Sequence, residues 1–79
     1  MQTDHFVQTF RRMGKKLVAQ PPQPCRSADH AILRAEQLGQ GEHKGAIAIS
    51  VSGEPEFGDF EPPVVLKFVG DVPLEFSKA

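Results

Sequence analysis

Ala46-Ile47-Ala48-Ile49-Ser50-Val51 decides the fold, because large and small side chains alternate along this stretch with a period of two. That period predicts a β-strand. A second stretch, Val64-Val65-Leu66-Lys67-Phe68-Val69, is rich in β-branched and aromatic residues and predicts the strongest strand of the chain. Each stretch follows a polar loop that contains turn residues, at 39–45 and at 53–63. We therefore expect two strands in the second half of the chain.

The start of the chain predicts a β-hairpin. Residues 5–12 and 16–19 are rich in aromatic and β-branched side chains and read as its two strands. Gly14 lies between them and supplies the positive φ that a short hairpin loop needs. Pro21, Pro22 and Pro24 end the second strand, because proline has no N–H to donate to a neighbouring strand.

A helix of about eleven residues is expected between the hairpin and the later strands. Ser27 is a favourable N-cap, and Asp29 lies in the first turn, where the helix dipole favours an anion. Gly39 follows Leu38 and predicts the end of the helix. One stripe of the helix collects its small and apolar residues, which are Ala28, Ala31, Ile32, Ala35 and Leu38. Among the apolar residues of the helix, only Leu33 lies outside this stripe.

The element order is therefore β-β-α-β-β in a single domain, residues 1–79, since 79 residues are too few for two hydrophobic cores. This order predicts an α+β fold in which one helix covers one face of a four-stranded, mainly antiparallel sheet. If one set of alternate residues turns toward the helix, namely Ile47, Ile49, Val51, Val64, Leu66 and Phe68, a second set lines the opposite face. That set is Ala46, Ala48, Ser50, Val65, Lys67 and Val69.

Such a face is more apolar than a face in contact with water, so we expect a partner to cover it. A second copy of the chain is the simplest partner, because two-fold homodimers are the commonest soluble oligomers. Leu33 is a further candidate contact, since it projects away from the helix stripe. The expected protein contacts on the sheet are Val65, Lys67 and Val69.

Charge is distributed unevenly along the chain, although the net charge is only −1. Residues 1–34 contain six Lys or Arg and two Asp or Glu, whereas residues 35–79 contain three and eight. The first part thus carries +4 and the second −5, which together give −1. The small net charge argues against a dedicated nucleic-acid-binding surface. The two charged halves instead predict pairing within the fold, between subunits or with separate partners.

The basic hairpin supports an alternative function. Arg11, Arg12, Lys15 and Lys16 surround Gly14, and clustered cations bind phosphate groups. Phe6 and Phe10 lie on the first strand at even spacing, which favours a core role over base stacking. The alternative is therefore weak nucleic-acid binding through the hairpin, set against an ordinary solvated or protein-contacting tip.

The loop at 53–63 carries a second unusual feature. Phe57 and Phe60 lie among four acidic residues, Glu54, Glu56, Asp59 and Glu61. The two rings either anchor the loop on the core or contact a protein partner with a basic surface. The acidic residues lack the regular alternation of a calcium-binding loop.

No pattern of residues predicts catalysis, a metal or a cofactor. Cys25 and His30 could form a nucleophile and base, but His30 falls on the polar side of the helix and no third group orients it. His5, Cys25, His30 and His43 lack the close ligand spacing of zinc sites. We therefore expect a protein that is not an enzyme and that needs no cofactor.

Cysteine content and hydropathy predict a soluble, cytoplasmic protein. The single cysteine, Cys25, forms no internal disulfide, which favours a reducing compartment. No apolar run approaches the roughly 18 residues that cross a membrane, and the N-terminus does not read as a signal peptide.

The last third of the chain resembles short uncharacterised bacterial proteins. The shared pattern combines Gly45-Ala46-Ile47-Ala48, Gly53-Glu54-Pro55-Glu56-Phe57-Gly58, Val64-Val65-Leu66 and Gly70-Asp71-Val72-Pro73. Those proteins usually have Ser-Arg-Thr-Gly-Asp-Pro where this chain has Ser50-Val51-Ser52-Gly53-Glu54-Pro55. The resemblance implies a small stand-alone protein and transfers no catalytic residue. Together these patterns predict a small, homodimeric protein-interaction module.

Overall fold

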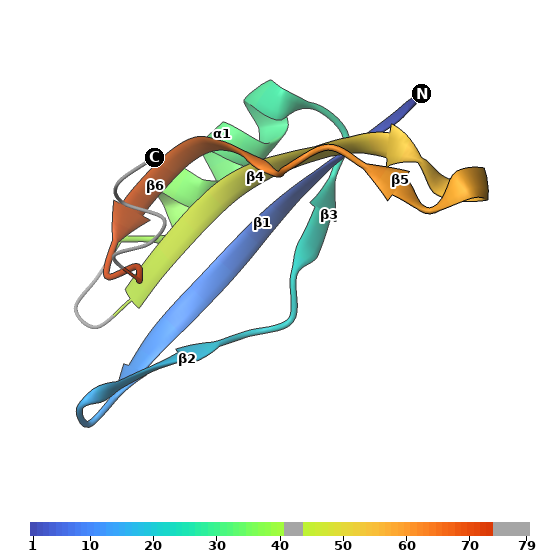
Figure 1. Cartoon of the computed structure of the whole chain (residues 1–79). Helices are drawn as coiled ribbons and strands as arrows, with labels where there is room; N and C mark the ends of the chain where they lie inside the picture. Colours follow the sequence, from blue (N-terminus) through green and yellow to red (C-terminus); the bar gives the residue numbers. More distant parts are fainter. Residues whose placement is uncertain (41–43, 74–79) are drawn as a thin grey trace.

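Two long antiparallel strands form the centre of the sheet in a computed structural model that describes residues 1–40 and 44–73 (Figure 1). Strand β1 (Gln2–Met13) pairs along most of its length with β4 (Lys44–Glu54). Each of them then pairs on its outer side with two short strands. These are β2 (Lys16–Ala19) and β3 (Gln23–Cys25) beside β1, and β5 (Asp59–Phe60) and β6 (Val64–Gly70) beside β4.

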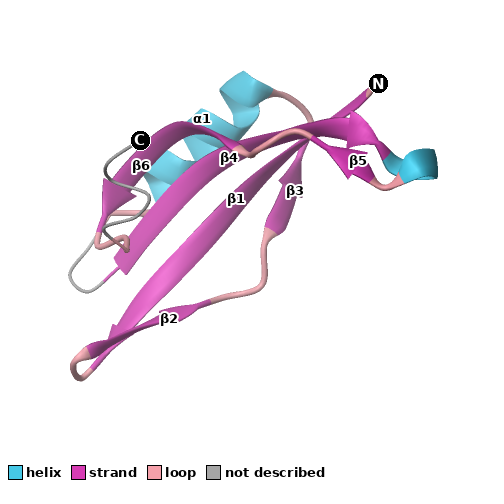
Figure 2. Ribbon diagram, viewed as in Figure 1, coloured by secondary structure: helices cyan, strands magenta, loops and turns pink. Residues whose placement is uncertain are grey.

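Proline pairs explain why the expected four strands are observed as six. Pro21 and Pro22 separate β2 from β3, and Pro62 and Pro63 separate β5 from β6. Proline cannot donate to a neighbouring strand, so each outer strand is interrupted where such a pair occurs. The six segments still occupy four positions across the sheet, and all pairings are antiparallel (Figure 2). The predicted α+β fold is confirmed.

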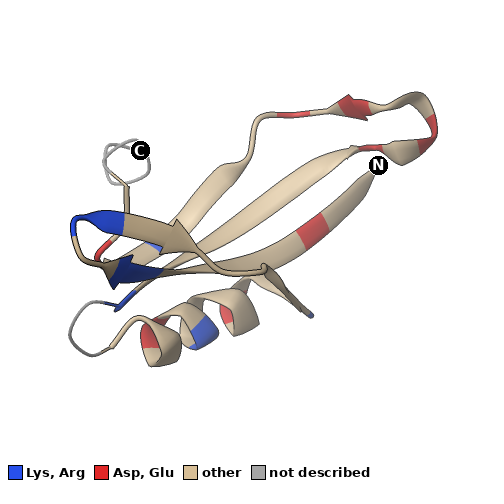
Figure 3. Ribbon diagram, turned by 90° about the horizontal axis from the view of Figure 1, so that it is seen from below, with Lys and Arg blue, Asp and Glu red and all other residues tan. Residues whose placement is uncertain are grey.

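Helix α1 (Ala28–Leu38) has the predicted bounds and lies along one side of the sheet (Figure 3). The hydroxyl of Ser27 accepts a hydrogen bond from the backbone N–H of His30, 3.1 Å away, as an N-cap does. At the other end, the N–H of Gly39 donates to the carbonyl of Ala35. Gly39 has a right-handed conformation with φ −83°, so the helix ends without the left-handed residue common at that position.

The first hairpin is also confirmed. Met13 pairs with Lys16 across a two-residue loop, Gly14-Lys15, in which Gly14 has φ +63°. This positive φ matches the right-handed twist of the flanking strands. The hairpin continues β1 to the end of the sheet, so its charged tip lies far from β5 and η1 (Pro55–Phe57) at the other end of β4.

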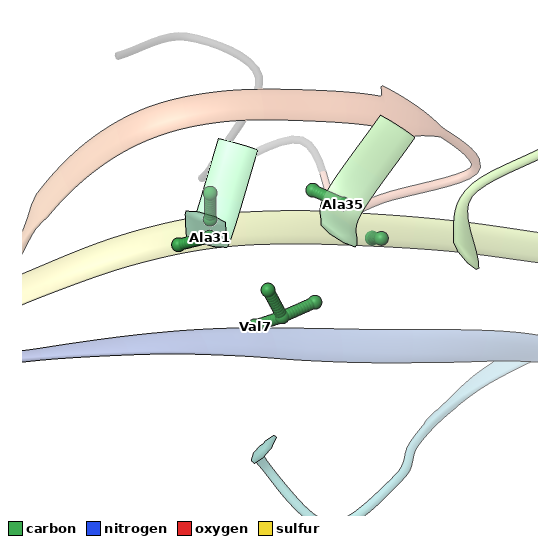
Figure 4. Close-up of a cluster of buried hydrophobic side chains, with 5 residues drawn as sticks. Val7, Ala31 and Ala35 are labelled. Atoms are coloured by element: carbon green, nitrogen blue, oxygen red, sulfur yellow. The ribbon is translucent and has the colours of Figure 1, made fainter. Parts of the chain in front are cut away.

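The helix covers the side of the sheet that carries small residues, and we call this side the covered face. Val7 on β1 and Ala46 and Ala48 on β4 form a fully buried cluster with Ala31 and Ala35 of α1 (Figure 4). The expectation that Ile47, Ile49, Val51 and Phe68 turn toward the helix is therefore wrong, whereas Leu66 does pack against this cluster. Alanine on both surfaces lets the helix approach the strand closely, which bulky residues on β4 would prevent.

A β-bulge separates Val65 and Lys67, which were expected to share one face of the sheet. The pairing of β4 with β6 shifts between Ala48 and Ile49, so that Ala48 lies opposite Lys67 and Ile49 lies opposite Val65. The bulge places Val65 and Lys67 on opposite faces, although their spacing of two predicts a common face. Lys67 forms an ion pair with Glu36 of the helix, with 3.1 Å between Nζ and Oε1. Lys67 therefore belongs to the covered face.

Val69 also belongs to the covered face. It pairs with Ala46, and its Cβ lies 2.7 Å from the position that a Cβ on Gly39 would occupy. Lys67 and Val69 are therefore not candidates for a contact on the uncovered side of the sheet. Val65 keeps the predicted placement.

Candidate interaction surface

The uncovered side of the sheet carries the large apolar side chains, and we call this side the open face. The strand register places alternate residues of β1, β4 and β6 on it. The large apolar side chains of the open face are Phe6, Phe10, Ile47, Ile49, Val51, Val65 and Phe68. The same alternation places four polar residues of β1 on this face, with Gln8 at its centre and the others toward the ends of the strand: Gln2, Asp4 and Arg12.

Exposure varies along the open face. Phe10 and Ile47 are buried near the hairpin, whereas Phe6, Ile49 and Val51 are half-buried. Phe68 is 43% exposed on β6. The accessible apolar part of the open face is therefore its centre and the β6 side.

A shallow apolar hollow of ≈ 320 Å³ lies in the accessible part of the open face. Its lining comprises Phe6, Gln8, Pro22, Ile49, Val51 and Pro63. Pro22 and Pro63 come from the two proline pairs that interrupt the outer strands, so one proline borders the hollow from each edge of the sheet. The same residues that break the edge strands thus shape this surface.

Phe60 extends the apolar surface toward the end of the sheet. It lies opposite Gly53, and a Cβ on Gly53 would be 2.4 Å from Cδ1 of Phe60. The ring therefore packs over the glycine yet remains 56% exposed. Phe57, in the short helix η1, is 80% exposed, so the interpretation that it anchors the loop on the core is wrong.

The two ends of the sheet carry opposite charge (Figure 3). The hairpin end, which we call the basic end, has four exposed cations without an ion-pair partner among the described residues. They are Arg11, Lys15, Lys16 and Lys44. The opposite end has three exposed carboxylates that likewise form no ion pair within the described chain, and we call it the acidic end: Glu56, Asp59 and Glu61.

One charged residue near each end of the sheet has an ion-pair partner within the fold. Arg12, expected to contact nucleic acid, lies 3.0 Å from Asp71 through Nε and Oδ2 and donates a hydrogen bond to it. Glu54 of the acidic loop lies 2.9 Å from the N-terminal amine. Arg12 is therefore removed from the set of unpaired cations, and Lys44 joins that set. The sequence does not place Lys44 beside the hairpin, because that proximity depends on the pairing of β1 with β4.

Leu33 is 53% exposed, as its position outside the helix stripe predicts. It belongs to the helix that packs on the covered face, and the sheet separates it from the open face. Leu33 and the open face therefore do not form one continuous surface.

The residues considered for catalysis make local contacts. Cys25 packs against the buried cluster and its thiol is 3.8 Å from the carbonyl of Gln23. Nδ1 of His30 accepts a hydrogen bond from the backbone N–H of Arg26 at 3.3 Å. His5 shares a hydrogen bond of 2.7 Å with Ser50, and His43 lies outside the described residues. Within residues 1–40 and 44–73, no three His, Cys, Asp or Glu side chains are grouped to hold a metal.

Comparison with known proteins gives no relative. No protein-family model matches the chain, and no curated protein or solved structure matches it significantly. The resemblance of the last third to short bacterial proteins stays a prediction. The surface of the molecule therefore provides the only indication of its function among these observations.

Proposed function

We propose that this protein is a small, non-enzymatic module that binds another polypeptide chain through the open face. The observation that carries the proposal is the apolar hollow between Pro22 and Pro63, on a sheet face that the helix does not cover. An apolar surface with a charged border is typical of a protein interface.

A protein fits this surface better than a small molecule does. Small-molecule sites combine an apolar lining with a few polar groups that orient the ligand. Among the described residues that line the hollow, Gln8 is the only polar one, and its amide already donates to the backbone carbonyls of Thr9 and Gln20. A second polypeptide needs no such group, because shape and apolar contact over a wide area suffice.

We also propose a cytoplasmic location. The thiol of Cys25 is free, which agrees with a reducing compartment. No helix in the described part of the chain is long and apolar enough to cross a membrane.

Photo-crosslinking in cells tests the proposed binding surface. A photoreactive phenylalanine analogue replaces Phe68 on the open face and, in a matched control, Leu33 on the helix, since these side chains are 43% and 53% exposed. We expect protein adducts from position 68 and few from position 33. Equal labelling from both positions, or none from position 68, contradicts the proposal.

Weak nucleic-acid binding is a second candidate function, favoured by the four unpaired cations of the basic end. The buried Phe10 and half-buried Phe6 are not displayed at that end, so binding there depends on phosphate contacts. Lys15→Glu with Lys16→Glu is expected to abolish salt-sensitive binding to short oligonucleotides, measured by fluorescence anisotropy. Binding that survives both reversals contradicts this candidate.

A further inference from the structure

We propose that the polypeptide on the open face is a second copy of this chain, arranged so that each basic end contacts the partner's acidic end. This inference rests on the proposed function and specifies its partner. The two open faces pack against each other around a two-fold axis that runs across the strands. The distribution of charge, the symmetry of a dimer and the size of the face support this arrangement.

The charges of the two ends cannot compensate each other within one copy. Strand β1 has 12 residues, and β4 has 11, so the ends are separated by about 35 Å at the usual rise per residue. Exposed charges are largely screened beyond about 8 Å at physiological salt. A second molecule is therefore needed to bring the unpaired cations and carboxylates together.

Symmetry then selects one arrangement of two copies. Two sheets that meet face to face can be related by an axis along the strands or by an axis across them. An axis along the strands places like ends together, which costs free energy by repulsion. An axis across the strands places the cations around Lys15 opposite the partner's carboxylates around Asp59, twice in each dimer.

The open face also has a suitable size and chemistry. The molecule measures 40 × 22 × 22 Å, and a face of that length and width matches the roughly 800 Å² that each partner contributes to a standard interface. Packed sheets lie about 10 Å apart with interdigitated side chains. The half-buried Ile49 and Val51 and the exposed Phe68 would supply the apolar centre, with the charged ends as its border.

Charge reversal at the two ends tests this arrangement. One variant combines Lys15→Glu and Lys16→Glu, which neutralises the basic end, because Arg11 and Lys44 remain beside the two new carboxylates. The other combines Glu56→Lys and Asp59→Lys, which makes both ends basic. All four side chains are exposed, so both variants are expected to fold. We expect self-association of each variant alone to weaken more than tenfold, measured by sedimentation velocity over a concentration series.

A mixture of the two variants is the decisive sample. In the heterodimer the intact acidic end of the first variant contacts the intact basic end of the second, and the other contact is close to neutral, so we expect a heterodimer tighter than either homodimer. A matched control combines Arg26→Glu and Arg34→Glu, which changes the net charge equally at exposed sites outside the basic end. This control should still self-associate, and in its mixture with the lysine variant the control homodimer should predominate, because a mixed dimer places the control's basic end opposite an end that is also basic.

The outcomes separate this inference from the proposed function. A wild-type protein that stays monomeric at high concentration overturns the homodimer, and so does a mixture that forms no heterodimer. Cross-links from position 68 to a different protein would then leave the proposed function standing. Cross-linked products of twice the chain mass, together with the rescued heterodimer, support both.

Discussion

The two faces of β4 differ in the size of their side chains and in what covers them. On the covered face, Ala46 and Ala48 are fully buried beneath α1. On the open face, Ile49 and Val51 are larger yet only half-buried. The helix therefore packs on the face that permits close approach, and the bulkier face remains for another contact. Hydrophobicity alone does not identify the face that a helix covers.

This difference gives a physical reason for the proposed association. The buried cluster on the covered face contains Val7 and four alanines, so it buries little apolar surface from each side chain. Small domains have little free energy of unfolding to begin with. Contact across the open face would bury larger side chains and thereby stabilise the folded chain by mass action.

The largest effect is expected from Ile47→Ala. Ile47 is fully buried on the open face, and removing its side chain should lower the free energy of unfolding by about 2–5 kcal/mol. Ile49→Ala changes a half-buried position of the same face and should lower the free energy of unfolding by a smaller amount, up to about 2 kcal/mol. Urea denaturation at one fixed protein concentration measures both. Equal losses of unfolding free energy would contradict the division of the open face into a buried part, which contains Ile47, and an accessible part, which contains Ile49.

A smaller loss is expected when the covered face is overpacked. Ala35→Leu adds three carbon atoms at a fully buried site where α1 meets β4. This overpacking should lower the free energy of unfolding by about 1–3 kcal/mol. Gln37→Leu adds an apolar side chain at an exposed position of the same helix and is the matched control. Thermal unfolding measures both variants. Tolerance of leucine at position 35 would show that close approach does not determine which face the helix covers.

Most of the fold follows from local sequence signals. The helix bounds follow from Ser27 and Gly39, and the first hairpin follows from Gly14 between two strand-like segments. The division of each outer strand was not expected, although both proline pairs are visible in the sequence. A pair of prolines predicts a strand end, whereas resumption of the strand beyond it depends on the long neighbour that it pairs with.

The candidate site was predicted less well because it depends on pairing between distant segments. Lys67 and Val69 lie on the covered face because they pair with Ala48 and Ala46, whereas the bulge beside Ile49 places Val65 on the open face. No local signal marks the bulge. Phe6 and Pro22 also line the hollow, although nothing in their own segments indicates it. One signal was available: the small residues of the helix stripe match the small residues of β4, which identifies the covered face.

A still smaller effect is expected at the hairpin end of the open face. Arg12→Ala removes the ion pair with Asp71, whose two side chains are 34% and 42% exposed. Such partly exposed pairs contribute up to about 1 kcal/mol. The loss should shrink at high salt, because screening weakens the pair in the wild type. Urea denaturation at low and high salt measures it, and a loss that does not depend on salt would indicate a packing role for the arginine side chain.

The smallest effect is expected from Leu33→Ala. Leu33 is 53% exposed and Phe68 of the open face is 43% exposed, so exposure alone would assign Leu33 to an interface. It lies on the helix, however, and the sheet separates it from the open face. We therefore expect the free energy of unfolding to change by less than about 0.5 kcal/mol and self-association to remain unchanged, measured by urea denaturation and sedimentation velocity. Weaker association in this variant would move the interface from the open face to the helix.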